Sequence, residues 1–189
     1  TARWDSLVAL LQRQAELPGA DLVAIHVATA IIWADNVGDV ARALDELELA
    51  LRGRGPEASA VAALEKILSE AKDVESRARA ATLLEPVYLL HGDFRRVIGT
   101  LKARLEATSD PTERKDLLGR LAKIYEEQTE EFGEALETVA LLFHEDPADE
   151  ATQAELERLA KVSNSQARLA EIYAAILGNV TSDDVVSAR

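Results

Sequence analysis

Residues 118–147 read LGRLAKIYEEQTEEFGEALETVALLFHEDP, and this stretch decides the fold. Apolar side chains recur every three or four residues before and after a polar segment at 128–133, which is helical spacing. The pattern predicts two helices joined by a short turn. The same spacing extends along the rest of the chain, and no segment shows the alternation of a half-buried strand. We therefore predict an all-α fold.

Short polar segments mark the helix boundaries. Asp110-Pro111 supplies an N-cap and a proline at the first helical position, with Glu113 placed for a capping box, and Asp146-Pro147 repeats the device. The predicted helices span residues 3–16, 20–35, 39–52, 57–70, 74–90, 93–107, 111–128, 131–144, 148–161 and 165–177, with a further partial helix from 182.

Composition limits the classes of function. The 189 residues are 48% hydrophobic and carry a formal charge of −13, which argues against nucleic acid or an anionic membrane as the main partner. The absence of cysteine excludes disulfides, thiolate metal sites and a cysteine nucleophile. The longest apolar stretch, 22–34, is too short to span a bilayer, so no membrane insertion is expected.

The chain matches itself after a shift of 92 positions. Residues 30–69 align without a gap on 122–161. Identical pairs include Ala30 with Ala122, Ile32 with Ile124, Ala43 with Ala135, Leu44 with Leu136, Leu49 with Leu141, Leu64 with Leu156 and Glu65 with Glu157. A shift of 90 also aligns Trp4 with Phe94 and Leu7 with Val97. These matches indicate an internal duplication.

Residues 118–147 resemble a tetratricopeptide repeat. Leu118, Leu121, Ala122 and Tyr125 match the first helix of that repeat, Ala135, Val139 and Leu142 match the second helix, and Pro147 matches the proline after it. Residues 26–55 and 81–111 are similar more loosely, with Glu85 in place of a small residue. The resemblance implies an α-solenoid, a right-handed superhelix of antiparallel helix pairs with about ten to eleven helices.

The predicted organisation is a single helical-repeat array over residues 1–189. The first repeat covers about 1–91, the second about 92–178, and a further helix begins at 182. Five helices per repeat break strict alternation, and Pro86 inside the helix at 74–90 predicts a kink or break near 83–86 where the superhelix changes direction.

The first residue, Thr1, and the lack of methionine suggest a fragment of a larger protein. Fifteen arginines against six lysines favour a GC-rich bacterial source. The compartment is left open, and the lack of a visible targeting segment favours the cytoplasm.

No residue pattern predicts catalysis. His26, His91 and His144 are scattered, and we expect His26 to be a core histidine bonded to a backbone carbonyl. The glycines form no phosphate-binding loop, and the paired carboxylates lie at predicted helix ends. We therefore predict no catalytic residue, cofactor or metal ligand, and no enzyme.

Charge is unevenly distributed. Basic residues gather within 95–123, and six glutamates follow within 126–137. Salt bridges inside the array explain this division better than a charged ligand groove does.

The resemblance to tetratricopeptide repeats implies a concave groove lined by the first helix of each pair. The residues placed toward that groove are Ala24, Val27, Ile31 and Ala34 in one helix, and Asp116, Lys123, Glu126 and Glu127 in another. The helix at 20–35 is apolar all round, so either neighbouring helices enclose it or a partner covers its groove face.

The predicted function is a non-catalytic protein-protein interaction scaffold in a larger bacterial protein, as the resemblance implies. Its partner would be a protein or peptide, or neighbouring repeats of the same chain, and a homo-oligomer is compatible with the pattern. Two alternatives stay open: a structural spacer or self-assembling segment, and a regulatory helical domain attached to an enzyme elsewhere in the parent chain.

Overall fold

A computed structural model describes the backbone of residues 2–52 and 57–187, and the side chains of 3–52 and 57–176. Within these residues the chain forms ten α-helices, one π-helical segment and no strand, so the all-α prediction is confirmed. The elements are α1 (Ala2–Ala15), α2 (Leu22–Ile31), η1 (Ile32–Val37), α3 (Val40–Leu51), α4 (Ala58–Glu70), α5 (Val74–His91), α6 (Phe94–Ala107), α7 (Pro111–Glu127), α8 (Phe132–Glu145), α9 (Glu150–Val162) and α10 (Gln166–Ser187).

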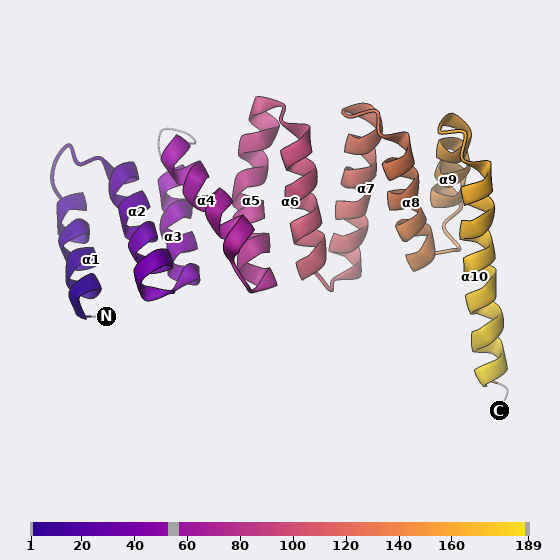
Figure 1. Cartoon of the computed structure of the whole chain (residues 1–189), viewed down its shortest axis with the longest axis horizontal. Coiled ribbons are helices and arrows are strands. Elements are labelled where there is room, and N and C mark those ends of the chain that lie inside the picture. The colour runs from indigo at the N-terminus through magenta and orange to yellow at the C-terminus, as the bar shows by residue number, and fades with distance from the viewer. Residues whose placement is uncertain (1, 53–56, 188–189) are drawn as a thin grey trace. The chain divides into compact units, whose positions relative to one another are not determined.

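The chain divides into two compact units, Thr1–Ala107 and Thr108–Arg189, which we call the N-terminal unit and the C-terminal unit. Successive helices within each unit run alternately up and down and pack on the next in the chain (Figure 1). The most extensive packing in the N-terminal unit joins α5 to α6, followed by α2 to α3 and α4 to α5. In the C-terminal unit α8 packs on both α7 and α9.

Helix starts follow the predicted caps, with one correction. The Asp110 side chain accepts hydrogen bonds from the backbone N–H groups of Thr112 and Glu113, and Pro111 opens α7 as expected. Asp146-Pro147 does not open α9, because Asp149 is the residue that caps this helix, accepting from the backbone N–H groups of Ala151 and Thr152. Pro147 lies in the turn before it.

Two predicted interruptions are absent. Helix α5 continues through Pro86, so of the kink or break expected near residues 83–86 the break does not occur. Pro86 is exposed on this helix, where its ring can be accommodated without displacing core side chains. Helix α10 runs to Ser187, whereas the sequence predicted a gap between 177 and 182.

The sequence match at 92 positions is also a structural match. Helices α3 and α8, α4 and α9, and α5 and α10 each begin 92 residues apart. Leu44 and Leu136 are both buried, and even the exposed Leu49 has an exposed equivalent in Leu141. These equivalent leucines therefore meet the same environment in both halves of the chain.

The core consists of leucine, alanine and valine on the facing sides of the helices. The largest fully buried side chains are mostly leucines, among them Leu44, Leu64, Leu101, Leu118 and Leu156. Leucine and alanine combine high helix propensity with close helix approach, which explains the abundance of both residues. Among the described residues, the helices are too short or too polar for one to cross a bilayer.

Candidate functional site

The four groove positions predicted in the first helix have different environments. Ala24 and Ile31 are exposed, and Ala34 is half-buried. Val27 is buried, with only 6% of its surface exposed, so at this position the alternative of a helix enclosed by its neighbours applies. Val27 is enclosed because α2 has neighbours on several sides: it packs against α1, α3 and α4.

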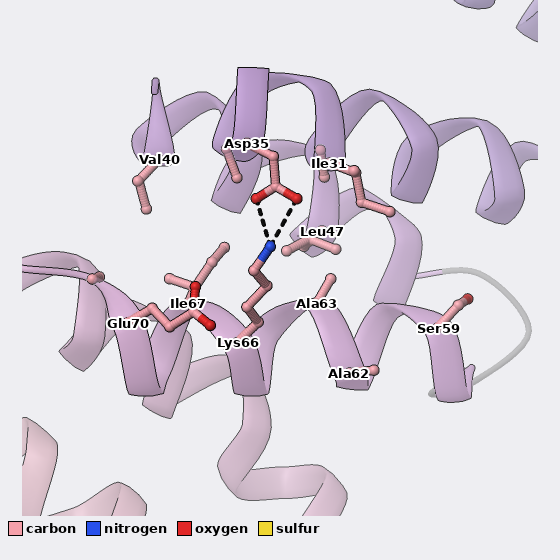
Figure 2. A pocket seen from close by; sticks show the side chains of 13 residues that line it. Ile31, Asp35, Val40, Leu47, Ser59, Ala62, Ala63, Lys66, Ile67 and Glu70 are labelled. Carbon is pink, nitrogen blue, oxygen red and sulfur yellow. Dashed lines mark hydrogen bonds and ion pairs between the residues drawn. The ribbon is translucent and has the colours of Figure 1, made fainter. Parts of the chain in front are cut away.

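Ile31 and Ala34 border a hollow of about 410 Å³ between α2, η1, α3 and α4, which we call the apolar hollow. Figure 2 shows Ile31 and Asp35 on one side, and Ala63, Lys66 and Ile67 of α4 on the other. The hollow exists because much of its wall consists of alanine, whose side chains leave space between helices that larger residues would fill. The alanines are Ala30, Ala34, Ala62, Ala63 and Ala71.

An ion pair crosses the apolar hollow. Lys66 Nζ donates to both carboxylate oxygens of Asp35 at 2.8 Å (Figure 2). The hydrogen bond to Asp35 is the main cause of the raised pKa of Lys66, and the nearby charge of Glu70 acts in the same direction. Two carboxylates thus accompany one ammonium group at this site, which leaves its edge net negative.

A second hollow of about 470 Å³ lies between α7, α8 and α9, and we call it the charged hollow. Seven of its ten lining residues are 92 positions after residues that line the apolar hollow. The equivalent pairs are Ala30 and Ala122, Ile31 and Lys123, Ala34 and Glu126, Asp35 and Glu127, Leu47 and Val139, Ser59 and Ala151, and Ala63 and Glu155. The duplication has therefore produced the same hollow twice with different chemistry.

Beside the charged hollow an arginine takes the position that Lys66 has beside the apolar hollow. Arg158, 92 positions after Lys66, donates to Glu126 and Glu155 at 2.6 Å. These two bonds raise the pKa of Arg158, and its guanidinium lowers the pKa of Glu155. The position of the cation is kept while the surrounding wall changes from apolar to acidic.

The structure brings three of the four predicted residues of α7 together. Lys123, Glu126 and Glu127 line the charged hollow. Asp116 lies outside it, exposed, with Arg120 one turn away at 4.0 Å. Sequence reasoning missed the α4 wall of the apolar hollow, although the small pair Ala62-Ala63 next to Lys66 was a visible signal.

Salt bridges join helices two apart in the chain. Within the N-terminal unit, Lys66 of α4 reaches Asp35 of η1, Arg79 of α5 reaches Asp45 of α3, and Arg96 of α6 reaches Glu65 of α4. Within the C-terminal unit, Lys115 of α7 reaches Asp149 before α9, and Arg168 of α10 reaches Glu137 of α8. Six basic residues of 95–123 form described salt bridges within the chain, in agreement with the predicted intramolecular pairing: Arg96, Arg104, Arg114, Lys115, Arg120 and Lys123.

The histidines have separate surroundings. His26 Nδ1 lies 2.6 Å from Glu46 Oε2 of α3, so its partner is a carboxylate and the expected backbone carbonyl was wrong. His91 and His144 are exposed in the last turns of α5 and α8. Among the described residues, no three His, Asp or Glu side chains form a group that could hold a metal ion.

No protein-family model, curated protein or solved structure matches the chain. A proposal about its function therefore rests on the two hollows and on the packing that forms them.

Proposed function

We propose that the chain is a non-catalytic protein-interaction scaffold, built as a solenoid of tetratricopeptide-like helix pairs, and that its apolar hollow receives an apolar side chain of a peptide. Salt bridges between helices two apart in the chain support the solenoid. They join η1, the continuation of α2, to α4; α3 to α5; α7 to α9; and α8 to α10. Such pairs require next-nearest helices to lie side by side within each unit, as stacked helix pairs do.

The observation that carries the binding proposal is the apolar hollow itself. Ile31 keeps 46% of its surface exposed although Ala30 and Ile32 beside it are buried, and alanines leave about 410 Å³ open next to it. Protein ligand sites are concave, mostly apolar and equipped with a few polar groups that fix orientation, which Asp35 and Lys66 provide here.

The charges at the edge of the apolar hollow indicate which types of residue the bound peptide should carry. Asp35 and Glu70 outnumber Lys66 at the apolar hollow. A lysine or arginine next to the inserted apolar residue would therefore be attracted, and raised salt would weaken binding by screening that attraction. The peptide we expect is an apolar residue flanked by a basic one.

Selection from a random peptide library followed by calorimetry tests the proposal. Ala63→Phe should fill the apolar hollow and weaken binding of the selected peptides more than tenfold while the helical circular dichroism is retained. Ala170→Phe, at an exposed alanine of α10, is the matched control and should leave affinity unchanged. Selected peptides that bind Ala63→Phe as tightly as the unaltered chain would contradict the site. A library that yields no binder would favour the structural spacer.

A further inference from the structure

The apolar hollow and the charged hollow are alike in the buried part of their walls. Four of their seven equivalent pairs keep the character of the residue: Ala30 and Ala122, Leu47 and Val139, Asp35 and Glu127, and Ser59 and Ala151. The first two pairs are apolar and buried, so the bottom of both hollows is similar. These four positions therefore do not determine which ligand each hollow accepts.

The two hollows differ at three equivalent positions, where an apolar residue in one corresponds to a charged residue in the other. The pairs are Ile31 and Lys123, Ala34 and Glu126, and Ala63 and Glu155. All six residues are exposed or half-buried. The difference therefore lies at the mouth of each hollow, where a ligand enters.

Ion pairs join the charged residues at the mouth of the charged hollow. Arg158 donates to Glu126 and Glu155 at 2.6 Å, and Lys123 Nζ lies 3.9 Å from Glu127 Oε1. These groups keep contact with water, since the side chains of Arg158 and Glu155 are 45% and 41% exposed. An apolar side chain inserted among them would displace this water and offer the charged groups no hydrogen bond in return, which is unfavourable.

The apolar hollow presents a different mouth to the same side chain. Its ion pair, Lys66 with Asp35, lies beside the uncharged side chains of Ile31 and Ala63 (Figure 2). An apolar residue entering here would cover the exposed surface of Ile31 and remove apolar area from water on both partners, which is favourable.

We propose that these three positions determine the specificity of the scaffold. Ile31, Ala34 and Ala63 admit the apolar residue of a peptide, whereas Lys123, Glu126 and Glu155 exclude it from the charged hollow. Each chain therefore binds one such peptide although it has two hollows of similar volume. The inference rests on the proposed peptide binding at the apolar hollow and extends it by naming the residues that select the ligand.

A gain variant, which gives the charged hollow the residues of the apolar one, tests this assignment. It combines Lys123→Ile, Glu126→Ala, Glu155→Ala and Arg158→Lys, the last so that a lysine can pair with Glu127 as Lys66 pairs with Asp35. Calorimetry with a selected peptide should give one peptide per unaltered chain and two per chain of the gain variant. The gain variant is one charge less negative, so net charge would not explain added binding of a basic peptide.

A loss variant makes the opposite replacements: Ile31→Lys, Ala34→Glu, Ala63→Glu and Lys66→Arg. It should weaken binding by about tenfold or more while the helical circular dichroism is retained, because the C-terminal unit already accommodates these residues at the equivalent positions. The gain variant combined with Ala63→Phe should bind one peptide per chain. Its binding should shift the methyl signal of the isoleucine introduced at position 123.

The outcomes separate this inference from the proposed function. Two peptides per unaltered chain, or one per chain of a folded gain variant, would overturn the inference and leave binding at the apolar hollow to be judged by Ala63→Phe. An affinity unchanged in the loss variant would overturn it too, and Ala63→Glu alone gives the same test where a four-residue variant does not fold. A library without any binder would overturn both proposals.

Discussion

At the scale of single residues, the two halves of the chain close the same turn with different amino acids. Gly38 and Glu130, 92 positions apart, both have positive φ, at 81° and 54°. The following N–H donates to the carbonyl six residues back in each case, Asp39 to Trp33 at 2.8 Å and Glu131 to Tyr125 at 2.7 Å. Glutamate tolerates this left-handed conformation less well than glycine does.

Glu130→Gly should therefore raise the free energy of unfolding by about 0.5–1 kcal/mol, because it relieves backbone strain that exceeds the entropic cost of glycine. Gly38→Ala should lower it by about 1 kcal/mol, and for a conformational reason alone, since a Cβ at Gly38 would meet no atom within 4 Å. Urea denaturation measures both changes. A loss of stability in Glu130→Gly would contradict the assigned strain.

A second residue-scale feature is the carboxylate that caps α9. Asp149 accepts from Lys115 Nζ at 3.0 Å and from the hydroxyl of Thr152 at 3.0 Å. The bond from Lys115 is the main cause of a pKa lowered from 3.8 to about 2. The charged form is thus favoured by folding, so its contribution is present above pH 3.8 and is lost as the pH falls toward 2.

Carbon-detected NMR titration of the Asp149 carboxyl group should give a midpoint near 2 in the folded chain. Lys115→Gln removes the ammonium group and should move the midpoint upward toward 3.8. The loss of stability between about pH 4 and pH 2 should be smaller in Asp149→Asn. An unchanged midpoint in Lys115→Gln would show that the salt bridge does not set the pKa.

At the scale of helices, an ion pair between a buried glutamate and a half-buried arginine joins α5 to α6. Glu85 is 6% exposed and accepts from Arg104 at 2.8 Å. The Glu85 side chain therefore brings a charge into the interface that needs a partner there. Burying an ion pair contributes little net stability, but removing one member leaves a charge without its partner.

Glu85→Ala should lower the free energy of unfolding by about 1–3 kcal/mol, less than for a fully buried pair, because the Arg104 side chain that is left keeps 19% of its surface exposed. The double variant Glu85→Leu with Arg104→Leu should recover most of that loss, because apolar side chains of similar size need no partner. Chemical denaturation of the double variant, both single leucine variants and the unaltered chain gives the coupling energy of the cycle. Additive losses would mean that the two side chains act independently.

Pro86 is the other feature that belongs to the element scale. A proline inside α5 cannot donate to the carbonyl one turn before it, and its ring crowds that turn, yet the helix continues to His91. Pro86→Ala restores the donor at an exposed position and should raise the free energy of unfolding by about 1–3 kcal/mol. Thermal unfolding measures this, and a lower melting temperature would show that the proline is needed for the packing of α5.

At the scale of the whole molecule, the apolar periodicity and the polar turns between helices were sufficient to predict the helices. The starts of α3, α4, α5, α6 and α7 lie within one residue of prediction. Periodicity failed where another interaction decided the outcome. Asp149 rather than Asp146 caps α9 and also binds Lys115, and Val27 is buried because α2 packs against three helices.

The sequence singled out some of the residues that line the two hollows and missed others. Ile31 and Ala34 were singled out because they lie on an unusually apolar helix, and Lys123, Glu126 and Glu127 because their helix resembles a tetratricopeptide repeat; these five residues line the two hollows. Ala63 and Lys66 were missed because they belong to another helix and meet Ile31 only through tertiary packing. A pattern along one helix cannot show which residues of the next helix face it.

Isoleucine-methyl NMR during titration with a selected peptide tests the proposed function most directly. Ile31 and Ile67 line the apolar hollow, whereas Ile98 and Ile172 are buried in other parts of the fold. Peptide binding should shift the methyl signals of Ile31 and Ile67 with one common dissociation constant and leave those of Ile98 and Ile172 in place. Shifts confined to Ile98 or Ile172, or saturation of binding with no change at Ile31, would contradict the proposed site.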